Sequence, residues 1–130
     1  MTTVNIVCPV FPSEDPDKVR TAIERIFPDA VVGENDDGYV ATCDSLDNLA
    51  YWIRKQKILD ATRSVMMRGR KGQNRIVLHL NKQVAYMGKV SFIEPKAILG
   101  TIKVTIEDDD IIGLIDKVAP ETVDGEEVLR

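Results

Sequence analysis

Two glycines flank a pair of basic residues in the segment Gly69-Arg70-Lys71-Gly72, which is the strongest candidate for binding chemistry in this sequence. Glycine permits a positive backbone φ and a close approach to a ligand, while arginine and lysine present cationic donors. Backbone N–H groups in such a turn can surround an anion. No Lys-Ser/Thr pair follows the segment and no strand is predicted before it, so it is not a nucleotide-binding P-loop. A phosphate of a nucleic-acid backbone is the anion that it fits best.

Basic residues are concentrated around this segment. Arg54 to Arg75 contains eight basic residues with Asp60 as their one acidic neighbour, whereas residues 1–53 contain three basic and ten acidic residues. The net charge of the whole chain is −4. Local potential rather than net charge attracts a polyanion, so the separation of charge predicts RNA-backbone contacts between Arg54 and Lys89. The predicted contacts are Lys57, Arg63, Arg68, Arg70, Lys71, Arg75, Lys82 and Lys89.

Aromatic residues make up 5% of the chain, which is few for a protein that binds single strands by stacking bases. Recognition of structured RNA through its backbone and its shape fits this composition better. Which RNA is bound, whether binding depends on sequence, and the oligomeric state are left open by the sequence.

Catalytic and metal-binding patterns are weak. His79 is the one histidine, so a histidine-based triad has no second candidate. The run Asp108-Asp109-Asp110 precedes a predicted helix, where capping and the helix dipole explain it, and it lacks the spacing of a calcium loop. We therefore predict no catalytic residue, no metal and no other cofactor, and a protein that is not an enzyme.

The N-terminus has neither the basic region nor the apolar region of a secretory signal, and no apolar run approaches the ~18 residues of a membrane span. Cys8 and Cys43 lie in apolar stretches without the spacing of a redox or zinc motif, and we interpret them as buried thiols. These features predict a cytoplasmic protein with no membrane partner.

Period-2 alternation and helical spacing predict the elements that must position the basic residues. Strands are expected over residues 3–11, 30–34, 39–43, 75–81 and 101–107, and helices over residues 16–27, 46–68 with a break near Lys57, 82–88 and 109–118. The order is β-α-β-β-α(α)-β-(short α)-β-α. It predicts a single-domain α+β protein whose mixed sheet carries helices mainly on one face. Residues 1–120 are the expected domain, and 121–130 a flexible C-terminal tail.

The segment from Leu78 to Phe92 reads LHLNKQVAYMGKVSF, and LGTIKV follows from Leu99 to Val104. Together they resemble the signature of the archaeal uncharacterised protein family 0201. The resemblance implies RNA binding, no established catalytic residue, and a fold similar to that of the fifth large-subunit ribosomal protein. An RNA of the ribosome or of RNA processing is the partner it implies. Thr101 departs from the pattern, since we expect proline there in many members.

The resemblance highlights Asn81, Lys82, Gln83, Ala85, Gly88, Phe92 and Gly100. Asn81 is well placed to cap the short helix after it, Lys82 and Gln83 read as exposed donors, and Gly88 lets the chain turn. The stretch is therefore open to two interpretations, a strand-to-helix junction and an RNA contact. Among these positions we assign Asn81, Gln83, Gly88 and Gly100 to the structural motif.

An interaction module with no nucleic-acid role is the alternative. Alternation places Val7, His79, Lys103 and Thr105 on a polar sheet face that could form a homodimer. The acidic first half of one copy could also pair with the basic segment of another, and such a dimer would weaken with salt.

Overall fold

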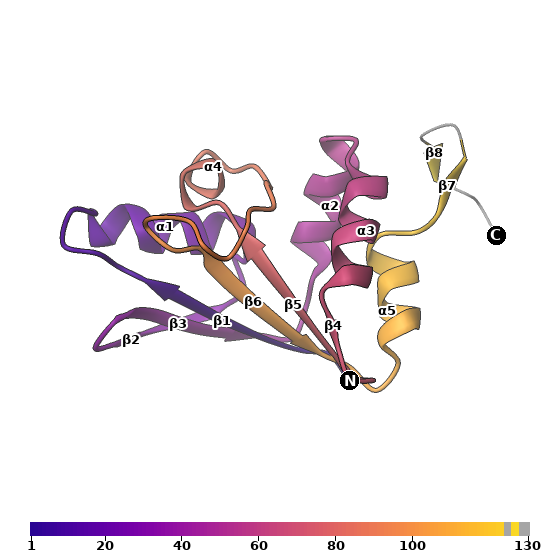
Figure 1. Ribbon diagram of the computed structural model, residues 1–130, viewed down its shortest axis with the longest axis horizontal. Helices are drawn as coiled ribbons and strands as arrows, with labels where there is room; N and C mark the ends of the chain where they lie inside the picture. Colours follow the sequence, from indigo (N-terminus) through magenta and orange to yellow (C-terminus); the bar gives the residue numbers. More distant parts are fainter. Residues whose placement is uncertain (124–125, 128–130) are drawn as a thin grey trace.

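The computed structural model describes residues 1–123 and 126–127 (Figure 1). Strand and helix bounds follow the predicted order with three additional short strands. The strands are β1 (Thr3–Pro9), β2 (Val31–Asn35), β3 (Gly38–Cys43), β4 (Arg70–Lys71), β5 (Arg75–Leu80), β6 (Ile102–Glu107), β7 (Thr122–Val123) and β8 (Glu126–Glu127). The helices are α1 (Pro16–Ile26), α2 (Asp47–Lys55), α3 (Leu59–Arg68), α4 (Lys82–Tyr86) and α5 (Ile111–Val118). No described helix has the length and apolarity that crossing a bilayer requires.

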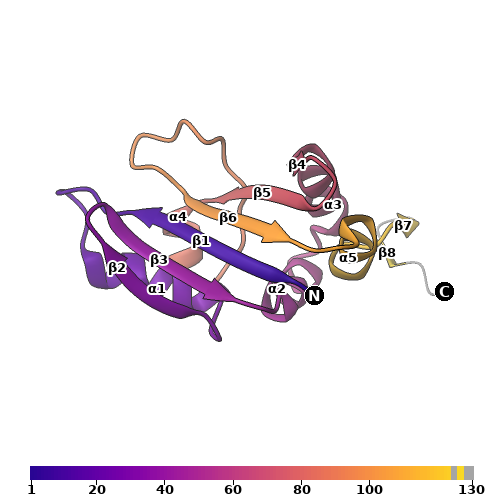
Figure 2. The same ribbon diagram turned by 90° about the horizontal axis from the view of Figure 1, so that it is seen from below.

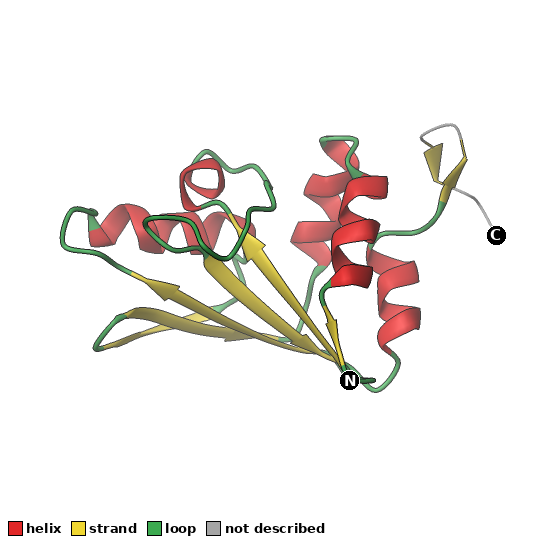
Figure 3. Cartoon of the chain, viewed as in Figure 1, coloured by secondary structure: helices red, strands yellow, loops and turns green. Residues whose placement is uncertain are grey.

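Six strands form one sheet in the order β2-β3-β1-β6-β5-β4. The helices lie on one face of it (Figures 1 and 3), and the view from below shows the other face without helices (Figure 2). The predicted α+β class with helices on one face is confirmed. We expected a mixed sheet, whereas each pair of neighbouring strands runs antiparallel. The α1 crossover makes β2 parallel to β1, but β3 returns between them and pairs with both.

The core lies between the sheet and the helices. Ile6, Leu78 and Val104 point from three neighbouring strands toward the helices, and each is buried. Ile23 of α1 and Ile53 of α2 are fully buried against the same cluster. Because side chains alternate along a strand, the residues between these core positions belong to the open face.

Several predicted helix boundaries are confirmed. The Asp15 side chain accepts a hydrogen bond from the backbone of Asp17 at the start of α1, where Pro16 is the first helical residue. The Asn81 side chain accepts one from the N–H of Val84, 3.1 Å away, and so caps α4. The predicted break between α2 and α3 falls at Lys57, whose φ of 59° no α-helix accommodates.

The C-terminal region contains more structure than the tail we predicted. β7 and β8 pair as a small hairpin. Glu121 forms an ion pair with Arg63 of α3 at 3.6 Å, and the Thr122 hydroxyl donates to the Asp60 carboxylate. Residues 124–125 and 128–130 of the expected tail lie outside the described residues, and the flexibility of the segment stays a prediction.

Candidate nucleic-acid interface

The segment Gly69-Arg70-Lys71-Gly72 does not form the anion-binding turn that we predicted. Arg70 and Lys71 are extended and form β4, which pairs with β5 at the edge of the sheet. A Cβ added at Gly69 would lie 2.4 Å from the carbonyl oxygen of Val77, so this glycine permits the close approach of the end of α3 to β5. The true turn follows at residues 72–74, where Gly72 has a φ of 70°. The segment between the two glycines therefore offers an anion its basic side chains and not a backbone turn of its own.

Four cations gather around this hairpin, and we call them the basic edge: Arg68, Arg70, Lys71 and Arg75. All four are exposed, and no acidic side chain among the described residues pairs with Arg68, Arg70 or Lys71. Arg75 pairs with Glu107 of β6 at 3.0 Å, with both side chains about half exposed. Such surface pairs contribute at most about 1 kcal/mol, so Arg75 can exchange this carboxylate for a phosphate.

Arg63 lies on α3 but makes internal contacts. Its side chain is 18% exposed, and its Nη1 atom lies 2.7 Å from the Asp116 carboxylate and 3.2 Å from the carbonyl oxygen of Ala119. Together with the Glu121 ion pair, these contacts tie α3 to the end of α5. Arg63 therefore stabilises helix packing, and its guanidinium is largely occupied before any RNA arrives.

Lys57 and Lys89 are exposed but stand apart from the basic edge. Lys57 precedes α3, so the ten residues of that helix, about 15 Å, separate it from Arg68. Lys89 follows α4, which lies beyond the opposite end of β5 from Arg75 (Figure 1). The structure brings four of the eight predicted contacts together and leaves these two as outlying cations.

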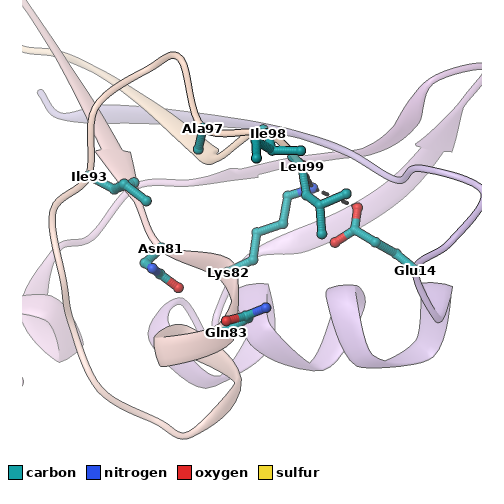
Figure 4. Close-up of a pocket in the computed structure, with 9 residues that line it drawn as sticks. Glu14, Asn81, Lys82, Gln83, Ile93, Ala97, Ile98 and Leu99 are labelled. Atoms are coloured by element: carbon teal, nitrogen blue, oxygen red, sulfur yellow. Dashed lines mark hydrogen bonds and ion pairs between the residues drawn. The ribbon is translucent and has the colours of Figure 1, made fainter.

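Lys82 is not the exposed donor that we predicted. Its side chain is 7% exposed, and the Nζ atom lies 2.6 Å from the carbonyl oxygen of Pro9, 2.5 Å from that of Leu99 and 2.9 Å from Oε1 of Glu14. Figure 4 shows the side chain reaching from α4 toward Glu14 and the loop before β6. Because an ammonium group has three donors, these contacts use all of them. Lys82 joins three separate segments of the chain and has no donor left for a phosphate.

The other motif positions lie at junctions of the fold. Gln83 is exposed on α4, and Gly88 turns the chain after it with a φ of 80°. Gly100 has a φ of 74°, and a Cβ there would lie 2.8 Å from the Pro9 side chain. Together with the cap at Asn81, this geometry supports the interpretation of the motif as a strand-to-helix junction.

His79 lies on the open face beside Lys103, its partner in the β5–β6 register. Its Nδ1 atom is 2.7 Å from the Thr101 hydroxyl. Burial first, and the neighbouring Lys103 second, lower the pKa of His79 below its usual 6.5. In the unfolded chain neither effect operates, so the unfolded state takes up a proton at higher pH than the folded state.

We expect this difference to reduce stability as the pH falls below about 6.5, until the folded imidazole is itself protonated. Denaturant unfolding of the wild type and of His79→Gln between about pH 7.5 and pH 5 measures it. The variant should lose less stability over this range than the wild type. Equal losses in the two proteins would contradict the assignment.

Two features of the site escaped prediction. The strand β4 is two residues long and too short for a period-2 signal. Lys103 is exposed on β6 in register with His79, and the alternation of residues 101–107 placed it on this face without joining it to the basic cluster. The signal for Lys103 was present, but the sharing of one open face by Lys103, Arg75 and Lys71 depends on the strand order.

Comparison with known proteins adds the family context. A family model described as RNA binding matches residues 3–108. A UPF0201 protein of Sulfolobus acidocaldarius is 41% identical over 134 residues, which cover 96% of this chain and 92% of that protein. A UPF0200/UPF0201 protein of Archaeoglobus fulgidus is 39% identical over 128 residues, and here the chain spans 39% of the relative's length. The crystal structure of a UPF0201 protein from Methanococcus jannaschii superimposes with a TM-score of 0.89 at 34% identity, covering 99% of this chain and 100% of that one.

Proposed function

The chain belongs to the archaeal UPF0201 family and matches a family model for RNA binding, and from these matches and the exposed cations of the basic edge we propose that it binds structured RNA through the phosphate backbone. The matching family model describes RNA binding, and we propose that the chain binds RNA without transforming it. The likeness to the fifth large-subunit ribosomal protein, an RNA partner in the ribosome or in RNA processing, and the cytoplasmic location stay predictions.

The single observation that carries the proposal is the pairing state of the cations. Neither Arg70 nor Lys71 forms an ion pair with a described acidic residue, although the chain is net acidic. Cations on an edge strand also prevent the edge from pairing with other chains. This structural role and RNA binding are compatible, because both require the charges to face solvent.

The contact set is smaller than the sequence predicted. We propose phosphate contacts by Arg68, Arg70, Lys71 and Arg75, with Lys57 and Lys89 reached by a larger RNA. We leave out Arg63 and Lys82, because both cations are satisfied within the protein.

Structured RNA is favoured over single strands because Phe92, the aromatic residue that lines a cavity with Arg68, is partly buried against the core and is not an exposed ring for stacking. The exposed Tyr51, at 54%, lies on α2, and Phe11 lies in the loop after β1. A-form RNA presents its phosphates in a regular array, and side chains can recognise that array without unstacking a base.

Fluorescence anisotropy with a labelled RNA hairpin at about 50 and 200 mM salt tests the proposal. Four phosphate contacts give a slope of about −3 in log K against log salt, so affinity should fall roughly 50-fold or more over this range. Absence of binding at the lower salt concentration would overturn RNA binding in this form. Light scattering at the same two concentrations covers the alternative, since a homodimer held by the acidic half and the basic segment should dissociate as salt rises.

A further inference from the structure

The face of the six-stranded sheet opposite the helices is uncovered (Figure 2). Among the paired strand residues that face away from the helices, Glu107 is the one carboxylate, and it forms an ion pair with Arg75. Lys71, Arg75 and Lys103 point to the same face, and the other strand positions that the register places there are uncharged. In a chain of net charge −4, this face is therefore cationic, and Lys71 makes it continuous with the basic edge.

Three uncharged polar side chains form a row across the middle of this face. Thr42 of β3, Asn5 of β1 and Thr105 of β6 are consecutive partners in the strand register. Neighbouring strands lie about 4.8 Å apart, so the row spans roughly 10 Å. Each side chain is at least partly exposed, and none has a hydrogen-bond partner within the described residues. Two hydroxyls and one amide thus offer both donors and acceptors to solvent.

Cations flank the polar row on both sides. On one side of the row, Lys103 lies two residues before Thr105 on β6. It pairs with Val7 of β1 and His79 of β5. On the other side, Glu107 lies two residues after Thr105. It pairs with Arg75 of β5, which pairs in turn with Lys71 of β4. A ligand that runs along the strands therefore meets charge, then neutral hydrogen-bonding groups, then charge again. The minor groove of A-form RNA has the same order, since phosphates border a wide, shallow floor of 2′-hydroxyl groups.

We propose that the minor groove of an RNA duplex docks on this open face and that Thr42, Asn5 and Thr105 contact its 2′-hydroxyls. The inference rests on the proposed function and adds the element that distinguishes RNA from DNA. The cations bind the phosphates of either nucleic acid, whereas the polar row has partners in RNA alone, because DNA lacks the 2′-hydroxyl. Selectivity and affinity therefore depend on different residues.

The test combines Thr42→Val with Thr105→Val, which replaces each hydroxyl by a methyl group and keeps the β-branched shape that suits a strand. Binding of a labelled RNA hairpin and of the DNA hairpin of the same sequence is measured by anisotropy. RNA affinity should fall roughly tenfold, because two hydrogen bonds are lost, while DNA affinity stays the same. An RNA hairpin with 2′-deoxy sugars in its stem should bind the wild type and the double variant equally.

Thr21→Val is the matched control, because it makes the same exchange on α1, in the helix layer on the other side of the sheet. It should leave both affinities unchanged. Thermal unfolding of each variant establishes that the sheet is intact. If the wild type prefers RNA and the double variant retains that preference, the assignment of the polar row is overturned while RNA binding by the basic edge stands. If the wild type binds neither hairpin, the proposed function fails together with it.

The variant Val7→Glu tests whether this face binds an RNA or a second copy of the chain. Val7 is 46% exposed beside the polar row, so a carboxylate there repels phosphates. The variant should bind both hairpins more weakly and should elute as the same species as the wild type. A wild-type dimer that Val7→Glu converts to a monomer would assign the face to self-association and overturn the inference.

Discussion

Replacing Lys82 with methionine is expected to lower the free energy of unfolding by about 3–5 kcal/mol, although this lysine lies in the segment that the sequence assigns to RNA contact. Its ammonium group is 7% exposed and bonds Glu14, itself 12% exposed, as well as the carbonyl oxygens of Pro9 and Leu99. Methionine fills a similar volume but leaves the Glu14 carboxylate buried without a counter-charge. In a chain of this length the melting temperature should fall by more than about 10 °C.

The variant Lys82→Met with Glu14→Gln is the matched control for this result. It removes both charges, so no unpaired carboxylate stays buried, and much of the lost stability should return. At a temperature where Lys82→Met is folded, its RNA affinity should equal that of the wild type. A variant of normal stability that has lost RNA binding would instead support the direct contact that the sequence suggests.

Reversing two charges at the basic edge, Arg70→Glu with Lys71→Glu, is expected to weaken binding of an RNA hairpin more than 100-fold at about 50 mM salt. Two phosphate contacts are lost and replaced by repulsion, so the salt slope should also decrease by about 1.5. The melting temperature should change little, since both side chains are exposed on a strand of two residues and pair with no acidic group among those described.

Lys18→Glu with Arg20→Glu alters the net charge of the chain by the same amount at two exposed positions of α1, away from the basic edge. This control should retain most of the RNA affinity. Similar losses in the two double variants would show that binding follows overall charge and would argue against a localised site. The comparison therefore tests whether the position of the cations matters.

The local sequence pattern was sufficient to predict most helices and strands of the fold. Alternation along residues 3–9 and 75–80 predicted which side chains enter the core, and the turn Asn35-Asp36-Asp37-Gly38 predicted the hairpin of β2 and β3. The end of α3 at Gly69 and the cap at Asn81 were equally visible. These features depend on neighbours within a few positions, which is the range over which periodicity and capping act.

The candidate site was predicted less completely, because a cation has the same sequence signature whether it is free or paired. Arg63 and Arg70 belong to the same basic run, yet Arg63 contacts Asp116, 53 residues later in the chain, while Arg70 faces solvent. Lys82 bonds the carbonyl oxygen of Pro9, 73 residues earlier. Neither contact leaves a trace in the spacing of nearby residues.

The sequence by itself determined the α+β class, the faces of the strands and the concentration of positive charge between Arg54 and Arg75. Tertiary structure alone decided the burial of Lys82 and the strand order, which places Lys103 of β6 on the same open face as Arg75 of β5. The physical reason is the range of the interactions. Side-chain periodicity follows from backbone geometry within one element, whereas the partner of a charge is set by which distant segments the folded chain brings together.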